Sequence, residues 1–322
     1  MRSTERAKPS LTDSAPECPN PASIGHNNRV THDAASPAPA NQDALDELVT
    51  LLDLEAIEVN LFRGVNPDVS RQRVFGGQVA GQALVAAVRT VDDMAVHSLH
   101  AYFLRTGDPT TPILYQVDRL REGRSFRTRR VVAIQHGEAI FNLQASFHAE
   151  EEPAITHELA MPEVPGPDEL PNFHTRMAPF KDLLGEFYDR NRPIDTRHVD
   201  FSPTDRRQEL APYQRTWFRA DGTLPDQPTL HACVLAYASD MTLLDTAMLP
   251  HGSDQVEDPY FMASLDHAMW FHRPFRFDEW MLYAQDTPVA AGGRALARGL
   301  IYTQAGELAV SVVQEGLIRG KR

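Results

Sequence analysis

Cysteine is scarce in this chain of 322 residues, which contains only Cys18 and Cys233. Cys18 lies in a proline-rich tail and Cys233 in an apolar stretch, so the sequence supports neither a disulfide framework nor a thiolate metal site. Isolated thiols of this kind are typical of proteins from a reducing compartment. We therefore expect a cytoplasmic protein.

The sequence also lacks an excess of basic residues and a long apolar run. Its net charge of -13 repels phosphate backbones, which argues against a nucleic-acid function. No run approaches the roughly 18 apolar residues that a membrane span requires, and the N-terminus lacks the apolar core of a secretory signal. We expect no nucleic-acid partner and no membrane insertion.

Several common catalytic and cofactor motifs are missing as well. There is no Gly-x-Ser-x-Gly elbow, which weakens a serine-hydrolase hypothesis. There is no phosphate loop, no dinucleotide fingerprint and no set of histidines and cysteines with metal-ligand spacing. The sequence therefore predicts chemistry without a metal or an organic cofactor.

What the chain does contain is one unit that occurs twice. Ser98-Leu99, followed by Gln135-His136-Gly137-Glu138, recurs as Ser264-Leu265, followed by Gln304-Ala305-Gly306-Glu307. The offset is 166 residues at one end of the unit and 169 at the other. Two copies of nearly equal length thus lie in tandem.

Each copy has the pattern of one helix followed by antiparallel strands. The helical patterns cover residues 76–88 and 230–248. The first contains so many glycines and alanines that we expect a wrapping sheet to compensate, since glycine costs up to about 1 kcal/mol per helical position. Turn-like residues between the strands favour a meander. The predicted fold class is α+β, a tandem (double) hotdog with two long helices, each wrapped by an antiparallel β-sheet. The expected strands are 97–105, 112–120, 125–135 and 138–148 in the first copy, and 213–219, 264–273, 279–286, 293–304 and 307–318 in the second.

Composition divides the chain into four segments. Residues 1–42 are rich in Pro, Ser, Ala and Asn and show no periodicity, which predicts a disordered leader. Residues 43–150 form the predicted N-terminal hotdog domain, and residues 177–322 form the C-terminal one. Between them, residues 151–176 have the proline-rich, acidic composition of a linker.

Distinctive strings occur in both halves of the chain. The N-terminal half contains Val74-Phe75-Gly76-Gly77-Gln78-Val79 and His97-Ser98-Leu99-His100-Ala101-Tyr102-Phe103-Leu104-Arg105. The C-terminal half contains Asp266-His267-Ala268-Met269-Trp270-Phe271-His272-Arg273-Pro274-Phe275 and Val313-Gln314-Glu315-Gly316. Together these strings resemble the acyl-CoA thioesterase II family over about residues 45–319. The resemblance implies hydrolysis of fatty acyl-CoA thioesters to free fatty acid and CoA, with acyl-CoA as the substrate and no cofactor.

The resemblance also implies three catalytic residues, all in the C-terminal domain. In that family an Asp on the second hotdog helix, a Thr or Ser just before the Asp-His pair and a Gln on the last strand hold the attacking water. By position these residues are Asp240, Ser264 and Gln314.

The chemistry of these residue types agrees with such roles. Attack of water on a thioester requires a base, an orienting hydrogen-bond partner and a site for the oxyanion. Asp240 can be the base, because desolvation on an apolar helix face raises a carboxyl pKa. Ser264 and Gln314 can hydrogen-bond the same water. From the pattern alone, a structural Asp, a strand serine and a ladder glutamine remain the alternatives.

Two further groups of residues are candidates for binding the substrate. Gly76, Gly77 and Gln78 open the first predicted helix, whose first turn offers free N–H groups and a close approach for the substrate. His267 belongs to the Asp-His pair, and we interpret it as mainly structural, near the site.

A basic cluster lies within this acidic protein, between Arg119 and Arg130. Its members Arg124 and Arg127 are candidates for binding the phosphates of CoA, for which guanidinium groups are well suited. The alternative is a solvated strand face.

Two other functions are compatible with the predicted fold. Hotdog enoyl-CoA hydratases use an Asp and a His a few residues later on the same helix, but Asp245 stands five residues after Asp240, and His251 follows Pro250. A non-catalytic acyl-CoA binding or sensing protein is the second alternative, and the retention of all three candidate catalytic residues argues against it.

The two copies are not chemically equivalent. The first lacks an Asp at the helix position of Asp240, so we expect one active site per chain, lined by both halves. Gln144 is the candidate counterpart of Gln314. We also expect a homo-oligomer of double hotdog chains, as the resemblance implies.

Overall fold

The computed structural model describes residues 41–67, 72–205, 208–252 and 260–321. The predicted leader, residues 1–42, lies outside this part except for its last two residues. Asn41 is the N-cap of the first helix, and Gln42 is its first residue. The side-chain oxygen of Gln42 accepts a hydrogen bond from the backbone N–H of Thr223 at 2.8 Å. Gln42 is thus fixed to the C-terminal half of the fold.

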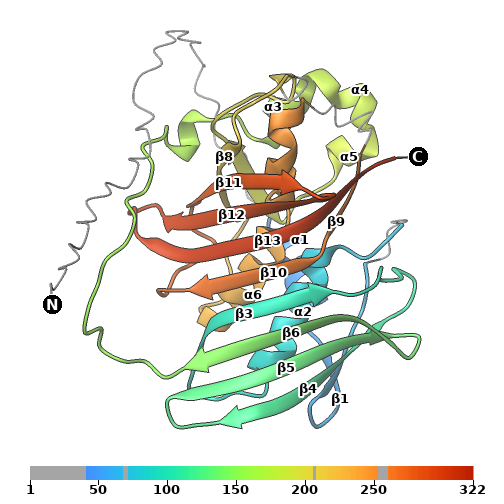
Figure 1. Ribbon diagram of the computed structural model, residues 1–322, viewed down its shortest axis with the longest axis vertical. Helices are drawn as coiled ribbons and strands as arrows, with labels where there is room; N and C mark the ends of the chain where they lie inside the picture. Colours follow the sequence, from blue (N-terminus) through green and yellow to red (C-terminus); the bar gives the residue numbers. More distant parts are fainter. Residues whose placement is uncertain (1–40, 68–71, 206–207, 253–259, 322) are drawn as a thin grey trace, which may run out of the picture. The chain divides into compact units, whose positions relative to one another are not determined.

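The N-terminal half forms the helices and strands that its sequence predicts, plus a short hairpin before them (Figure 1). The small-residue pattern at 76–88 is a helix with the predicted limits, which confirms that prediction. The elements are α1 (Gln42–Leu52), β1 (Glu55–Glu58), β2 (Leu61–Gly64), α2 (Gly76–Val88), β3 (Ala95–Phe103), β4 (Ile113–Glu122), β5 (Phe126–Gln135) and β6 (Glu138–His148).

The C-terminal half repeats this plan after a run of short helices. Its elements are η1 (Pro167–Glu169), α3 (Phe173–Met177), η2 (Ala178–Phe180), α4 (Lys181–Leu184), α5 (Glu186–Asp189), β7 (Ile194–His198), β8 (Tyr213–Ala220), α6 (Pro228–Ser239), η4 (Leu244–His251), β9 (Tyr260–Ser264), β10 (Asp266–Phe271), β11 (Met281–Ala291), β12 (Arg294–Thr303) and β13 (Leu308–Gly320).

All of these strands belong to one antiparallel sheet of 13 strands, and the two halves meet in its middle (Figure 1). From the centre outwards the order is β3-β6-β5-β4-β2 in one direction and β10-β13-β12-β11-β8 in the other. Strands β3 and β10 pair directly, with Leu99 opposite Met269. The identical order on both sides agrees with the repeat in the sequence.

The expected simple meander is wrong for β3, the first long strand. It pairs with β6 and β10 rather than with β4, while β4, β5 and β6 do form a meander. The segment around Gly107 and Asp108, predicted as a tight turn, instead crosses the ends of β5 and β6. It is held there by Gln135, whose side chain bonds the backbone N–H and the carbonyl of Asp108, both at 2.8 Å. Local turn residues do not reveal such a crossing.

Helices α2 and α6 pack against each other behind the sheet (Figure 1). A Cβ atom at Gly77 would collide with the carbonyl oxygen of Tyr237, and one at Gly81 would lie 3.2 Å from the carbonyl of Cys233. The glycines that make α2 a weak helix therefore serve the approach to α6, rather than an approach of the sheet as expected. A single apolar core runs through both halves. Its members include Leu84, Leu99, Phe141, Val234 and Ile301.

The second helix is shorter than predicted. Regular α6 ends at Ser239, Asp240 is its C-cap, and the chain continues as a turn into the 3-10 helix η4. The carbonyl of Thr242, which a continuing helix would use in its ladder, instead accepts a hydrogen bond from the side chain of Gln214 at 3.0 Å. The hydroxyl of Thr246 is also held by Gln214, at 2.8 Å. Side-chain partners of this kind compete with helical hydrogen bonds.

The predicted linker, residues 151–176, packs along the C-terminal half. Trp217 donates its indole N–H to the carbonyl of Pro165 at 2.9 Å. Met161 and Leu170 contact a buried apolar cluster that includes Trp217 and Trp280. Proline and acidic residues indicate irregular backbone, but they do not exclude a role in covering a sheet.

One helical stretch is long and apolar enough to cross a membrane by length and composition. Among the described residues it covers Pro228–His251, and its 18-residue window has a mean hydropathy of 1.2 and is 72% buried inside the protein. The sequence has no unbroken apolar run of that length, as predicted, but this measure allows polar residues such as Asp240 within the window. A mostly buried helix in the core of a soluble protein meets the same measure, and α6 contributes to the shared core.

The close contact between the helices predicts a graded response to alanine. We expect Gly77→Ala to destabilise the protein by about 2 kcal/mol or more, because the new methyl group meets the rigid backbone carbonyl of Tyr237. Gly81→Ala is the matched control. Its methyl group would lie 3.1 Å from the mobile end of Leu52 and 3.2 Å from the carbonyl of Cys233, a milder crowding than at Gly77, which the gain in helix propensity partly offsets. Urea unfolding measures both; equal stabilities would contradict the prediction.

Candidate active site

A carboxylate sits at the junction of the two central helices. Asp240 follows the last residue of α6, and its side chain lies over the first turn of α2. A Cβ atom at Gly76 would lie 2.8 Å from Asp240 Oδ2, and the backbone N–H of Gly77 donates a hydrogen bond to the carboxylate. The N-terminus of a helix carries partial positive charge, so this position favours the anion.

Two polar side chains from the sheet complete the group. Gln314 lies on β13, and its Nε2 donates to Asp240 Oδ1 at 2.7 Å and to Ser264 Oγ at 2.6 Å. The hydroxyl of Ser264 is 3.4 Å from Asp240 Oδ1. Ser264 ends β9 and pairs with Gly316, two residues after Gln314 on β13, so the pleat of one strand sets the spacing of the pair. The structure thus brings together the three residues predicted as catalytic.

Burial changes the acidity of this carboxylate. Desolvation raises the pKa of Asp240 from 3.8 to about 6. The hydrogen bonds from Gln314, Gly77 and Ser264 act in the opposite direction, and the nearby charge of Asp245 adds to the increase. The group is therefore an anion at neutral pH and a stronger base than an exposed aspartate.

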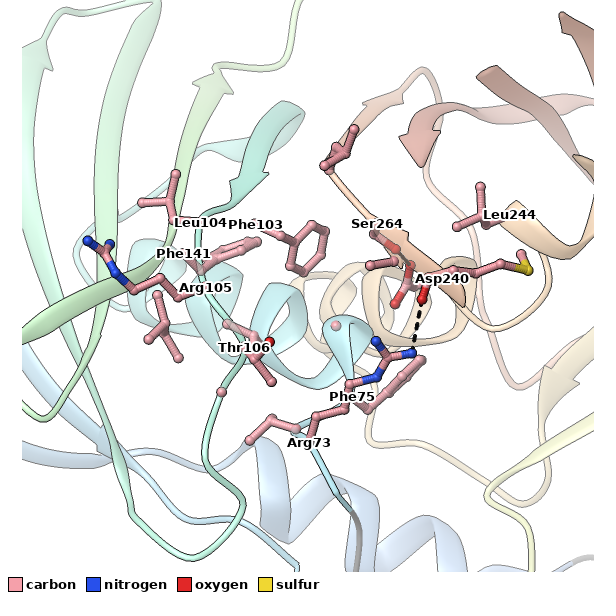
Figure 2. Close-up of a pocket in the computed structure, with 18 of the residues that line it drawn as sticks. Arg73, Phe75, Phe103, Leu104, Arg105, Thr106, Phe141, Asp240, Leu244 and Ser264 are labelled. Carbon is pink, nitrogen blue, oxygen red and sulfur yellow. Dashed lines mark hydrogen bonds between the residues drawn. The ribbon is translucent and has the colours of Figure 1, made fainter. Parts of the chain in front are cut away.

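Asp240 and Ser264 open into a cavity of about 740 Å³ between the two halves (Figure 2). In Figure 2, Phe103 and Phe141 lie on the side of the N-terminal half, and Asp240, Leu244 and Ser264 lie on the other side. Both halves line the cavity, as the sequence predicts. Gln314 is fully buried and does not line it, so it contacts the cavity only through Asp240 and Ser264.

The cavity has an apolar wall and a cationic rim. Aromatic and aliphatic side chains form most of the wall, namely Val74, Phe75, Val79, Phe103, Ile140, Phe141 and Leu244. Two exposed arginines stand at the rim. Arg73 donates to the carbonyl of Met262 at 3.2 Å (Figure 2). Arg105 donates to the carbonyl of Ala139 at 2.7 Å. A backbone carbonyl thus orients Arg73, whereas Arg105 is oriented by a backbone carbonyl and by an ion pair with Glu138 at 3.0 Å.

The three residues at the start of α2 that were predicted to bind substrate differ from one another in their surroundings. Gly76 lines the cavity. Gly77 lies beside it, and its N–H is used by Asp240 rather than left open for a substrate. The buried side chain of Gln78 points away, where it donates to Asn66 Oδ1 at 2.8 Å and to the carbonyl of Val65 at 3.3 Å.

The structure does not bring the other predicted binding residues to the cavity. His267 is buried, with Nε2 2.9 Å from Ser239 Oγ. Arg124 and Arg127 lie at the start of β5, where Arg127 pairs with Glu122 at 3.4 Å. The cavity touches β6 at Ile140 and Phe141, at the opposite end of the β5–β6 pair. The structure thus places these two arginines, predicted to bind the phosphates of CoA, away from this cavity.

Two further observations concern Gln144 and the rim. Gln144 is exposed, whereas Gln314 is buried, so Gln144 faces the wrong side of the sheet to be its counterpart.

Arg73 and Arg105 were missed as candidate site residues. Arg105 ends one of the strings quoted above, but no local pattern shows that a distant loop and strand end will meet at one rim.

The geometry satisfies the requirements for attack of water on a carbonyl. It supplies a base, a hydroxyl beside it and a cavity with a largely apolar wall. Within the described residues, no group of three or more His, Cys, Asp and Glu side chains could hold a metal ion.

Two family models match the chain. Residues 65–148 match the acyl-CoA thioesterase N-terminal domain, and residues 189–317 match acyl-CoA thioesterase. Human acyl-coenzyme A thioesterase 8 is 44% identical over 289 residues, covering 85% of this chain and 89% of the relative. Acyl-CoA thioesterase 2 of Haemophilus influenzae is 38% identical, covering 86% of this chain and 98% of the relative.

Solved structures of similar fold include an acyl-CoA thioesterase. The acyl-CoA thioesterase II TesB2 from Mycobacterium marinum is 48% identical, with a TM-score of 0.71, and covers 86% of this chain and 99% of that one. A hot dog protein from Alicyclobacillus acidocaldarius, 19% identical with a TM-score of 0.70, covers 86% of this chain and 99% of that one and shares the fold. The predicted double hotdog is confirmed. This chain therefore belongs to the acyl-CoA thioesterase family and is a thioester hydrolase.

Proposed function

We propose that the chain hydrolyses fatty acyl-CoA thioesters with a water molecule that Asp240 activates. Ser264 lies beside that water, and Gln314 holds Asp240 and Ser264 through hydrogen bonds. The observation that carries this proposal is a desolvated carboxylate, with a pKa of about 6, in the wall of an apolar cavity of about 740 Å³. The cavity offers space for the substrate at the point where the base is exposed.

The reaction takes two steps. Asp240 removes a proton from water as the water oxygen forms a bond to the thioester carbon, and Ser264 orients this water through its hydroxyl. The tetrahedral intermediate then breaks its C–S bond. Asp240 returns the proton to the leaving sulfur, so that the products are the fatty acid and CoA as a thiol.

The first turn of α2 supplies the site for the oxyanion. Because the N–H of Gly77 serves Asp240, we assign stabilisation of the oxyanion to the N–H of Gly76, which lines the cavity and lies among the first N–H groups of the helix. The positive end of the helix dipole adds to this effect.

The cavity matches the two chemically different ends of the substrate. Phe75, Phe103 and Phe141 give the wall the character that an acyl chain requires. Arg73 and Arg105 at the rim suit the phosphates of CoA, because guanidinium groups bind phosphate oxygens through paired hydrogen bonds. These two arginines replace Arg124 and Arg127 in that role.

The residues around Asp240 do not favour a hydratase. Such an enzyme would require a histidine beside the acyl chain, yet the described residues that line the cavity include none. His267 is directed instead at Ser239. Asp245 also lines the cavity, but it is an acid at the position where a hydratase would need a histidine.

Replacing the base tests the catalytic assignment. We expect Asp240→Asn to lower kcat at least about a hundredfold, the range for loss of a general base, while acyl-CoA still binds. Asp245→Asn is the matched control, since it removes a second carboxylate from the same cavity wall and is expected to keep turnover. Thiol release from decanoyl-CoA and calorimetric binding measure the two effects. Turnover by Asp240→Asn above a tenth of the wild-type rate would refute the assignment.

The raised pKa predicts the pH dependence. Because Asp240 must be ionised, kcat/KM increases with pH, is half-maximal near pH 6 and is level above about pH 7. Asp245→Asn is expected to move the midpoint to lower pH, because it removes a charge that raises the pKa. Ser264→Ala is expected to move it to higher pH, because it removes a hydrogen bond that lowers the pKa. Rates for decanoyl-CoA from pH 4.5 to 9 provide the check; a flat profile would contradict the role of Asp240.

The rim arginines are expected to affect KM rather than kcat. Arg73→Ala and Arg105→Ala each remove an exposed charge that binds CoA phosphates, so we expect KM to increase severalfold and kcat to remain unchanged. Arg124→Ala, at the far end of β5, is the control and is expected to change neither. Increasing the salt concentration reduces the difference from wild type. An unchanged KM in both rim variants would exclude this phosphate site.

A further inference from the structure

Two neighbouring side chains behind the catalytic group each have a buried polar atom without a partner. Among the described residues, neither His267 Nδ1 nor Gln314 Oε1 has a hydrogen-bond partner. His267 is 1% exposed and Gln314 is fully buried, so bulk water does not compensate for either atom. A buried polar atom without a partner is costly.

The sheet places these two residues opposite each other. On β10 and β13, Ala268 pairs with Val313, so the next pair in the same register is His267 with Gln314. Both side chains point to the core side of the sheet. The side chain of Gln314 also raises the pKa of His267, against the stronger effect of burial, which lowers that pKa to about 4. The imidazole is thus neutral, with one ring nitrogen that donates and one that accepts.

The remaining atoms of both groups are already committed. Gln314 Nε2 has two hydrogens, and these serve Asp240 at 2.7 Å and Ser264 at 2.6 Å. His267 Nε2 lies 2.9 Å from Ser239 Oγ. If Nε2 carried the ring proton, Nδ1 and Gln314 Oε1 would both be buried acceptors without a donor. If Nδ1 carries it, the hydroxyl of Ser239, for which the carbonyl of Ala236 at 3.1 Å is the competing acceptor, donates to Nε2, and His267 donates to Gln314.

We propose that His267 is a positioning residue that donates from Nδ1 to Gln314 Oε1 and thereby keeps the amide of Gln314 turned with its N–H groups toward Asp240 and Ser264. This inference rests on the catalytic roles proposed above and extends them by one residue. His267 acts through Gln314 and does not contact the substrate, since it does not line the cavity.

The other half of the same sheet provides an internal comparison. The β5–β6 and β12–β13 turns match at an offset of 169 residues, which places Ala145 at the position of Gln314. Its partner on β3 is Leu99, so the strand pairing places Leu99 at the position of His267, two residues away from its sequence match, Leu265. Both residues are buried, as their counterparts are. The fold therefore accepts an apolar pair here, and the polar pair occurs in the half that carries Asp240.

The orientation of the amide matters because of the charge on Asp240. A turned amide would direct Gln314 Oε1 at the carboxylate, which replaces a hydrogen bond by repulsion. The bond from Gln314 lowers the pKa of Asp240, so its loss raises that pKa further. The other titratable groups that act on Asp240 are Asp245 from η4 and Tyr283 from β11, and both remain unchanged in the variants below.

Three substitutions of His267 separate positioning from packing. His267→Asn places an N–H close to the position of Nδ1 and is expected to retain most activity. His267→Gln reaches the position of Nε2 and Ser239 but not Gln314, and His267→Leu copies the residue of the other half. For these two we expect kcat to fall about tenfold and the acid midpoint of kcat/KM to rise by about one pH unit, with KM unchanged. Equal losses in all three variants, or a wild-type pH profile in His267→Leu, would overturn the proposal.

A spectroscopic measurement tests the proton position without turnover. In long-range 1H–15N spectra of the full chain, with His267→Asn identifying the signal, we expect the Nδ1–H form of His267. The Nε2–H form would overturn the proposal. Asp240→Asn in the same rate assay distinguishes failure of the catalytic assignment from failure of the role of His267. Full activity of that variant would remove the catalytic assignment and this role with it. An inactive Asp240→Asn together with an unaffected His267→Leu and His267→Gln would remove only the role of His267.

Discussion

The contact between the start of α2 and the end of α6 is the constraint on which the rest of the site depends. Gly76 and Gly77 have no side chains, so the backbone of α6 approaches until Asp240 lies over the first turn of α2. The N–H of Gly77 in that turn then donates to the carboxylate, and Gly76 beside it lines the cavity. The carboxylate, the N–H groups proposed to act with it and the cavity thus result from one helix contact, which larger residues would prevent.

Duplication explains how such a site forms without equivalent chemistry in both copies. Each half contributes one long helix and one set of strands to a common sheet and core. The junction of the halves creates positions that neither half has alone, because the cavity is lined from both sides. The N-terminal copy has Leu99 and Ala145 where the C-terminal copy has His267 and Gln314. One copy therefore has an apolar pair at the place where the other has a polar pair beside Asp240.

Much of the fold follows from local patterns, since alternating strands and the small-residue helix are visible in the sequence. The family strings, rather than periodicity, pointed to Asp240, Ser264 and Gln314 as a group. Pairing of β3 with β6 and β10 could not be derived, because it depends on a connection anchored by Gln135. Arg73 and the end of α6 were missed for a similar reason. Both are determined by contacts between segments far apart in the chain.

The raised pKa of Asp240 has an energetic consequence for the whole protein. Each pKa unit corresponds to about 1.4 kcal/mol, so an increase from 3.8 to about 6 costs about 3 kcal/mol when the group is ionised. The native state favours the protonated form, so this cost is absent below the unfolded pKa and complete above pH 6. Without the hydrogen bonds from Gln314, Gly77 and Ser264 the pKa would be higher and the cost would be larger. The same donors therefore limit the destabilisation and keep the base available.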